Sequence, residues 1–106
     1  MTEKTINFIG TWESDERGTP RLEFTSDGTV RGTDGCNRIS TQFESGTDGV
    51  SAKLESFAST LKACQGVDTW LRSVREVRIE GDVMRILNSQ GEEIGQLQRQ
   101  SAESGT

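Results

Sequence analysis

Apolar and polar residues alternate along much of the chain in short segments, which is the pattern of strands with one buried face. Leu22 and Phe24 alternate with charged neighbours, and Val77 and Ile79 do the same in the second half of the chain. Strands patterned in this way bury every second side chain and leave the others in water. The alternation therefore predicts a sheet with one apolar and one wet face.

Turn signals separate these segments at short intervals. Glycine reaches positive φ without a Cβ penalty, and aspartate or asparagine can brace a turn through side-chain hydrogen bonds. Such residues cluster at 26–29, 33–35, 45–49, 80–82 and 88–91. Short strands joined by tight turns predict a mainly β fold, an antiparallel meander that curls into a barrel or a strongly curved sheet.

The last two expected strands have less regular patterns. Residues 83–87 are apolar except for one arginine, so we expect a central strand covered on both faces. Ile94 and Leu97 are separated by two residues, which breaks the strict alternation. This spacing predicts a twist or bulge in the last strand.

One segment has a helical period instead. Trp70, Leu71, Val74 and Val77 follow the spacing i, i+1, i+4, i+7. They predict a short α-helix at 68–76 that packs across one mouth of the sheet, with the aspartate at its first position as N-cap. Trp70 and Leu71 are the expected core anchors of this helix, so Trp70→Ala is expected to cost about 3–5 kcal/mol.

Length and composition limit the size of the core. Only 22 of the 106 residues are Leu, Ile, Val or Phe, about 21% of the chain, so the core must be thin. The length allows one small domain. We expect a lead-in at 1–8, the β domain at 9–98 and a disordered tail at 99–106. Trp12 and Phe24 are the expected core anchors of the sheet.

Charge and hydropathy exclude several classes of partner. The formal net charge of −5 argues against nucleic-acid binding, which needs clustered Lys and Arg. We interpret the nearest basic group, Arg72, Arg75 and Arg78, as a solvated face. No apolar run is longer than two residues, whereas a membrane helix needs about 20 and a signal-peptide core roughly 7–15. We therefore expect no membrane insertion and a cytoplasmic location.

The chain contains no histidine. This absence excludes Ser-His-Asp and Cys-His catalysis and every metal site that uses histidine. The acidic pairs at 15–16 and 92–93 consist of sequence neighbours, which point to opposite faces of a strand and cannot act together as acid and base. We therefore expect no enzyme activity, no metal and no cofactor.

Cys36 and Cys64 are the only cysteines, and three interpretations of them stay open. They form a disulfide, a redox-responsive dithiol or two small buried hydrophobes. A bridge would close a loop of about 29 residues and stabilise the fold by about 3.6 kcal/mol on the chain-entropy model. Asn37, after Gly35 and Cys36, is interpreted as a structural turn residue that tolerates a left-handed conformation. The hydroxyl residues at 59–60 are expected to cap a short turn.

Several landmarks follow one another in a characteristic order. The most specific is the turn Gly35-Cys36-Asn37, followed further along by Ser59-Thr60 and Ala63-Cys64. The other landmarks are Gly10-Thr11-Trp12, Leu22-Glu23-Phe24, Asp27-Gly28, Val30-Arg31-Gly32, Leu71, Leu87 and Gly91. From residue 9 to residue 97 the chain resembles the META domain family, also called the HslJ-like heat-shock family. The resemblance implies a barrel-like β domain with one helix, in bacterial proteins linked to heat shock, drug resistance or the cell envelope. It brings no catalytic residues.

These observations lead to one expected function and two alternatives. We expect a non-enzymatic, stress-associated accessory or binding domain, a monomer or weak dimer with a protein as its partner. One alternative is a carrier that holds a small molecule inside the barrel, which needs space left by small inward-facing residues. The other is a redox-responsive protein that uses Cys36 and Cys64.

Overall fold

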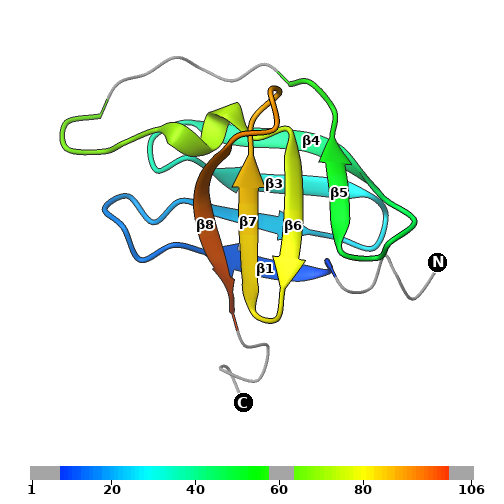
Figure 1. The fold of residues 1–106 in the computed structure, drawn as a ribbon. Helices are drawn as coiled ribbons and strands as arrows, with labels where there is room; N and C mark the ends of the chain where they lie inside the picture. The colour runs from blue at the N-terminus through cyan, green and yellow to red at the C-terminus, as the bar shows by residue number, and fades with distance from the viewer. Residues whose placement is uncertain (1–7, 58–63, 101–106) are drawn as a thin grey trace.

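The computed structural model describes residues 8–57 and 64–100, and these residues form eight strands and one 3-10 helix (Figure 1). The strands are β1 (Gly10–Glu13), β2 (Arg21–Phe24), β3 (Thr29–Thr33), β4 (Arg38–Ser45), β5 (Ser51–Leu54), β6 (Glu76–Glu80), β7 (Val83–Leu87) and β8 (Glu93–Arg99). The helix, η1 (Trp70–Ser73), comes just before β6. Each predicted turn lies at the junction of two consecutive strands and overlaps a strand by at most one residue.

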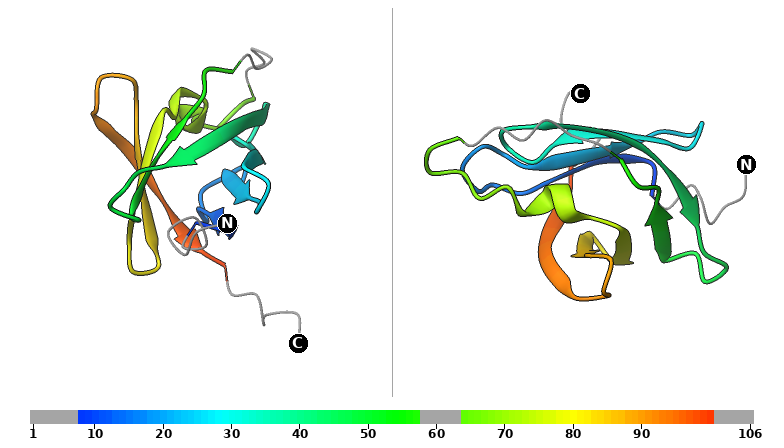
Figure 2. Two further views of the ribbon diagram at one scale, coloured as in Figure 1. Left: turned by 90° about the vertical axis from the view of Figure 1, so that its right-hand side faces the viewer. Right: turned by 90° about the horizontal axis from the view of Figure 1, so that it is seen from above.

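The strands form a closed antiparallel barrel. Each strand pairs with the next one along the chain, and β8 completes the ring by pairing with β1. Strands β1–β4 cross β6–β8 at a steep angle, so that the barrel consists of two crossed layers (Figures 1 and 2). The predicted antiparallel meander is confirmed, and closure leaves the barrel without the long free edges of an open sheet.

The interior of the barrel is filled by apolar side chains. Leu22 and Phe24 are buried as the alternation predicts, and so are the two apolar residues of β6. Phe8, Phe24 and Phe43 form an aromatic cluster with ring centroids 4.9–6.1 Å apart. The buried apolar residues are Phe8, Trp12, Leu22, Phe24, Val30, Ile39, Phe43, Ala52, Leu54, Leu71, Val74, Val77, Ile79, Met84, Ile86 and Leu97. An eight-stranded barrel has an interior just wide enough for side chains to fill.

Strand β7 differs from its prediction, whereas β8 agrees with it. Met84 and Ile86 are buried, but Val83 and Leu87 remain partly exposed, so this strand is covered on one face only. The reason is closure, because the outside of the barrel has no second layer to cover it. The predicted bulge is confirmed: Ile86 pairs with Gly95 and Leu87 with Glu93, which leaves Ile94 as the extra residue of β8.

The predicted α-helix at 68–76 is wrong. The segment contains only the four-residue η1, no side chain caps its start, and Val74 already has extended dihedral angles. The expected N-cap, Asp68, does not fill that position, which belongs to Thr69. Two helical turns are too short to be stable alone. Pairing of the following residues with β5 and β7 therefore decides the conformation.

The barrel extends slightly further than the predicted domain boundaries. Phe8, expected in the lead-in, is fully buried, and the indole Nε1–H of Trp12 donates to its carbonyl at 3.0 Å. Arg99, expected in the tail, pairs with Trp12 in the β8–β1 ladder. The N–H of Gln100 donates to the carbonyl of Thr11 at 2.9 Å. Both boundaries therefore move outward by at least one residue, and the rest of the expected tail lies outside the described residues.

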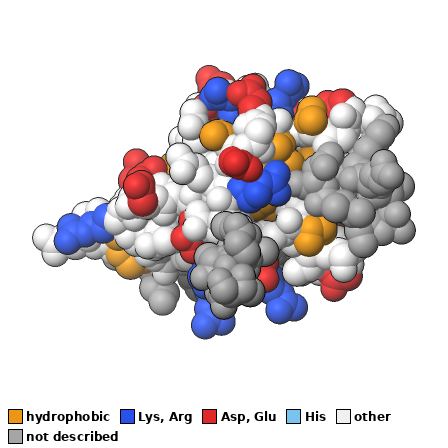
Figure 3. Space-filling model, turned by 90° about the horizontal axis from the view of Figure 1, so that it is seen from below, with side chains coloured by type: hydrophobic (Ala, Val, Ile, Leu, Met, Phe, Trp, Pro, Cys, Tyr) orange, Lys and Arg blue, Asp and Glu red, His pale blue; other side chains and the backbone are white. Residues whose placement is uncertain are grey.

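The surface mixes charged and polar side chains. On the face seen in Figure 3, hydrophobic side chains form small separate patches among Lys, Arg, Asp and Glu. Val50 is the exposed large hydrophobic residue in the described part of the chain. No helix in the described residues is long and apolar enough to cross a membrane.

Candidate functional site

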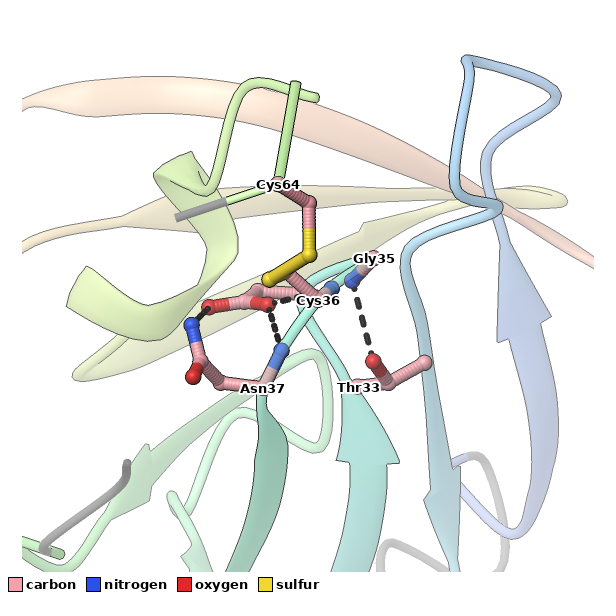
Figure 4. The surroundings of a disulfide bond; sticks show 6 residues. Thr33, Gly35, Cys36, Asn37 and Cys64 are labelled. Atoms are coloured by element: carbon pink, nitrogen blue, oxygen red, sulfur yellow. Dashed lines mark hydrogen bonds between the residues drawn. A yellow bond between two sulfur atoms is a disulfide. The ribbon is translucent and has the colours of Figure 1, made fainter. Parts of the chain in front are cut away.

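The turn between β3 and β4 is organised around one buried carboxylate. Asp34 is fully buried, and its Oδ1 accepts hydrogen bonds from the backbone N–H of Cys36, at 2.8 Å, and of Asn37 (Figure 4). Its Oδ2 accepts from Nδ2 of Asn37 at 3.2 Å. The N–H of Asp34 donates in turn to the carbonyl of Asn37 at 3.0 Å. The side chain thus fixes the turn from inside.

Gly35 occupies a position that no other residue fills easily. Its φ is +101°, and its N–H donates to the hydroxyl of Thr33 at 3.0 Å. A Cβ at this position would lie 2.9 Å from Cγ1 of Val67 and 3.4 Å from Cα of Gly18. The β1–β2 loop, the β3–β4 turn and the segment before η1 therefore meet at Gly35.

A disulfide joins two of these three segments. Cys36 and Cys64 are bonded in the structure, with their Cα atoms 5.8 Å apart (Figure 4). Of the interpretations left open by the sequence, the structure contains the bridged form. The bridge ties the β3–β4 turn to the chain that leads into η1, whereas the residues at 59–60 lie outside the described part.

Asn37 is a structural turn residue, but not in the expected way. It is buried and lies outside the left-handed region, and within the turn the positive φ belongs to Gly35 instead. Its role is to donate to Asp34 from both its backbone and its side chain. Sequence reasoning missed Asp34, although an aspartate two residues before Cys36 has the spacing of an Asx turn.

Trp70 lies at the edge of the core, whereas the other three expected anchors lie inside it. Trp12, Phe24 and Leu71 are buried, but Trp70 is half-buried and packs against the core from outside. A Cβ on Gly95 would lie 2.5 Å from its ring, so the missing side chain of this glycine makes room for the indole. Nε1 of Trp70 donates to Oε1 of Glu16 at 3.0 Å. Removing Trp70 should therefore cost less than the 3–5 kcal/mol expected for a buried anchor, about 1–3 kcal/mol.

The outer face of β2–β4 carries a groove of about 720 Å³ that the sequence did not reveal. Its lining includes Arg21, Glu23, Arg31, Thr33, Arg38 and Ser40. Cys36 also borders it, so the disulfide-bound turn forms one end of the groove. The arginines lie at the polar positions that alternate with buried residues on three consecutive strands. This shared alternation is the signal that could have found them.

The basic group considered from the sequence does not form one surface. Arg72 lies in η1, and the guanidinium of Arg75 stacks over the ring of Phe57 at 5.3 Å. Arg78 is on the outer face of β6 with its Nε 4.0 Å from Oε2 of Glu76. Arg75 and Arg78 therefore make separate local contacts.

A second groove lies beside the first, on the other side of β1. It has a volume of about 640 Å³, and its lining includes Glu13, Asp15, Glu16, Gln96 and Gln98. This groove is therefore acidic and amide-rich, in contrast to the arginine-lined groove. No group of three or more metal-ligating side chains occurs in the described residues.

Two exposed aspartates brace hairpin turns as anions. Hydrogen bonds from the hydroxyl of Thr25 and from Thr29 lower the pKa of Asp27 below its ordinary value. The backbone N–H of Val50, followed by that of Ser51, lowers the pKa of Asp48 in the same way. These carboxylates stabilise turns, and neither belongs to the arginine-lined groove.

These features define a small closed β-barrel with an apolar core, a disulfide-bound end and polar grooves on its outside. The chain belongs to the META domain family, whose model matches residues 5–101. The META domain is not a known enzyme family. Searches of curated proteins and of solved structures gave no significant match.

Proposed function

We propose that this protein is a non-enzymatic accessory or binding domain that contacts its partners through the outer surface of the barrel. The observation that carries the proposal is the burial of many large apolar side chains in the core. The large side chains of Trp12, Phe24 and Phe43 are buried in this core. The two grooves described above are on the outside. A ligand held inside would have to displace close-packed side chains, at a cost typical of overpacked cores.

The proposal is tested with an apolar fluorescent probe and a panel of small apolar ligands. The native protein is expected to show no saturable binding and no increase in melting temperature. Met84→Ala provides the matched control, because truncating this fully buried side chain leaves an apolar cavity that can take a small ligand. Stoichiometric binding by the native protein, at a level equal to that of the variant, would contradict an outside binding surface and favour the carrier.

We also propose that the partner is engaged during stress. The support is the family resemblance to heat-shock-linked proteins, together with membership in the META family. Site-specific photocrosslinkers on the outer face, for example at Ser40, should capture a defined protein more strongly after a heat pulse. A crosslinker at Gln90, in the β7–β8 turn, is the control. Equal capture at both sites and both temperatures would argue against this part of the proposal.

A redox-responsive function is the second candidate, and the bridge between Cys36 and Cys64 favours it. Reducing compartments keep thiols free, whereas oxidising ones preserve disulfides. In the expected cytoplasmic location, the bridge would therefore be open except under oxidative stress. Rapid alkylation of intact cells followed by mass measurement separates the outcomes. A bridge that is closed in all conditions is structural, and a bridge that closes only under oxidant is a sensor.

A further inference from the structure

We propose that the arginine-lined groove on β2–β4 docks an extended acidic segment of a partner protein. The inference rests on the proposed function, because it names the surface and the chemistry through which this domain would bind. Three properties of the groove lead to this proposal: the spacing of its arginines, the lack of ion pairs to their guanidinium groups in the described residues, and the single carboxylate in its lining.

The strand register gathers the three arginines around one threonine. Arg21 on β2 and Arg38 on β4 both pair with Thr33 on β3, one on each side. Arg31 lies two residues before Thr33 on the same face of β3. Neighbouring strands are about 4.8 Å apart, so Arg21 and Arg38 stand roughly 10 Å apart across the groove. Long flexible side chains at this spacing can converge on one bound segment.

The guanidinium groups of this groove are available for a ligand. In the described residues, none of the side chains of Arg21, Arg31 and Arg38 forms an ion pair or a hydrogen bond. Glu23 is opposite Arg31 in the register, and Glu13 is opposite Arg21, yet neither carboxylate closes an ion pair with its neighbour. All three arginines are exposed.

The groove also supplies hydroxyl groups beside the arginines. Thr33 lies between the two flanking arginines, and Ser40 pairs with Arg31 from β4. Hydroxyl and guanidinium donors together suit carboxylates, which accept several hydrogen bonds each. In an extended peptide, alternate side chains lie on one face about 7 Å apart. Acidic residues at alternate positions would therefore meet successive arginines.

The charge distribution favours a peptide over a nucleic acid. Glu23 lies within the lining and interrupts the positive strip, which a continuous polyanion would have to cover. The chain as a whole has a net charge of −5, which repels a long polyanion more strongly than a short segment with a few carboxylates. A short acidic segment can place its carboxylates near Arg21 and Arg38 and avoid Glu23.

A display library of random 12-residue peptides tests the proposal. The native protein is expected to select peptides with Asp or Glu at alternate positions, and their binding is expected to weaken as salt is raised. The variant R21Q/R31Q/R38Q should bind these peptides roughly tenfold or more weakly, because the loss of three charge-assisted contacts accumulates. The control R72Q/R78Q/R85Q loses the same charge elsewhere and should bind them as the native protein does. Circular dichroism confirms that both variants fold.

Each other outcome overturns the docking proposal. Peptides without acidic enrichment, or equal loss of binding in both variants, would show that the groove does not recognise acidic segments. Tighter binding of a single-stranded oligonucleotide than of the selected peptides would show that the groove prefers a nucleic acid. Self-association that is lost only in R21Q/R31Q/R38Q would show that the groove binds a second copy of this chain. If the groove binds no acidic peptide while the native protein still does not bind the apolar probe, the proposed binding function stands and its surface lies elsewhere on the barrel.

Discussion

The two outer faces of the barrel carry arginines in similar patterns but use them differently. On β6–β8, Arg85 donates to Glu80 at 2.9 Å and to Glu93 at 2.9 Å, and Arg99 donates to Asp82 at 3.1 Å. On β2–β4, the exposed arginines form no such pairs in the described residues. The first face is internally neutralised, and the second keeps its donors available for another molecule.

The positions of the neighbouring carboxylates distinguish Arg85 from Arg38. Arg85 has an acidic residue on each neighbouring strand at a diagonal position, Glu80 on β6 and Glu93 on β8. Both raise its pKa, Glu80 more strongly. Arg38, in contrast, is opposite Thr33. Cross-strand neighbours alone do not decide this, because in the described residues Arg21 and Arg31 form no ion pair although Glu13 and Glu23 are opposite them.

Among the changes considered, removal of the disulfide at the end of the arginine-lined groove is expected to have the largest effect on stability. C36S/C64S removes the bridge at one end of the arginine-lined groove and is expected to lower the free energy of unfolding by about 3–4 kcal/mol, because the unfolded chain regains loop entropy. Urea unfolding with and without reductant measures the effect. Native protein that unfolds at the same urea concentration in both conditions would mean that the bridge adds no stability.

Asp34→Ala should disturb the same end of the groove without touching the bridge. It leaves the buried N–H groups of Cys36 and Asn37 without their acceptor, which is expected to cost about 2–4 kcal/mol. Amide exchange of β3 and β4 should accelerate more than that of β6 and β7. Uniform acceleration over the barrel would show that this turn does not control the groove locally.

Single arginine substitutions on the two outer faces should change the melting temperature differently. Arg85→Gln breaks two ion pairs and should lower the melting temperature slightly at low salt, with the difference vanishing near about 1 M salt. Arg38→Gln breaks none and should leave the melting temperature unchanged at every salt concentration. Equal decreases of the melting temperature in both variants would show that the arginines of the two faces contribute equally to stability.

The smallest effect on stability is expected from Asp27→Asn, and only at acidic pH. Because the pKa of Asp27 is lowered in the folded state, its stabilisation is complete above the unfolded pKa of about 3.9 and is lost as pH falls through the lower folded value. Asp27→Asn should therefore flatten the fall of stability below about pH 4. Thermal melts from pH 2 to 6 measure this. A variant with the same pH dependence as the native protein would contradict the role of the carboxylate.

Local patterns along the chain predicted the strands well and the helix poorly. Leu22 and Phe24 face the core as their alternation requires, and the turn glycines lie where the chain reverses. Trp70 and Val74 have a helical spacing that also fits a single turn followed by a strand. Spacing alone does not distinguish the two, because pairing with distant strands supplies the deciding energy.

The candidate site was only partly visible in the sequence. Cys36, Cys64 and Gly35 stood out through residue type, because cysteine and glycine have properties that no neighbour shares. Asp34 and Arg38 did not, since aspartate and arginine are common surface residues. Their roles depend on burial in one case and on cross-strand neighbours in the other.

The sequence by itself determined the alternation of β2 and β6, the positions of five turns and the absence of histidine chemistry, because these depend on local stereochemistry and residue type. Tertiary structure decided the closure of the barrel through β8 and β1, the meeting of Cys36 with Cys64 and the gathering of arginines around Thr33. These features depend on register between strands. Register is set by the collective packing of the interior, which no single segment contains.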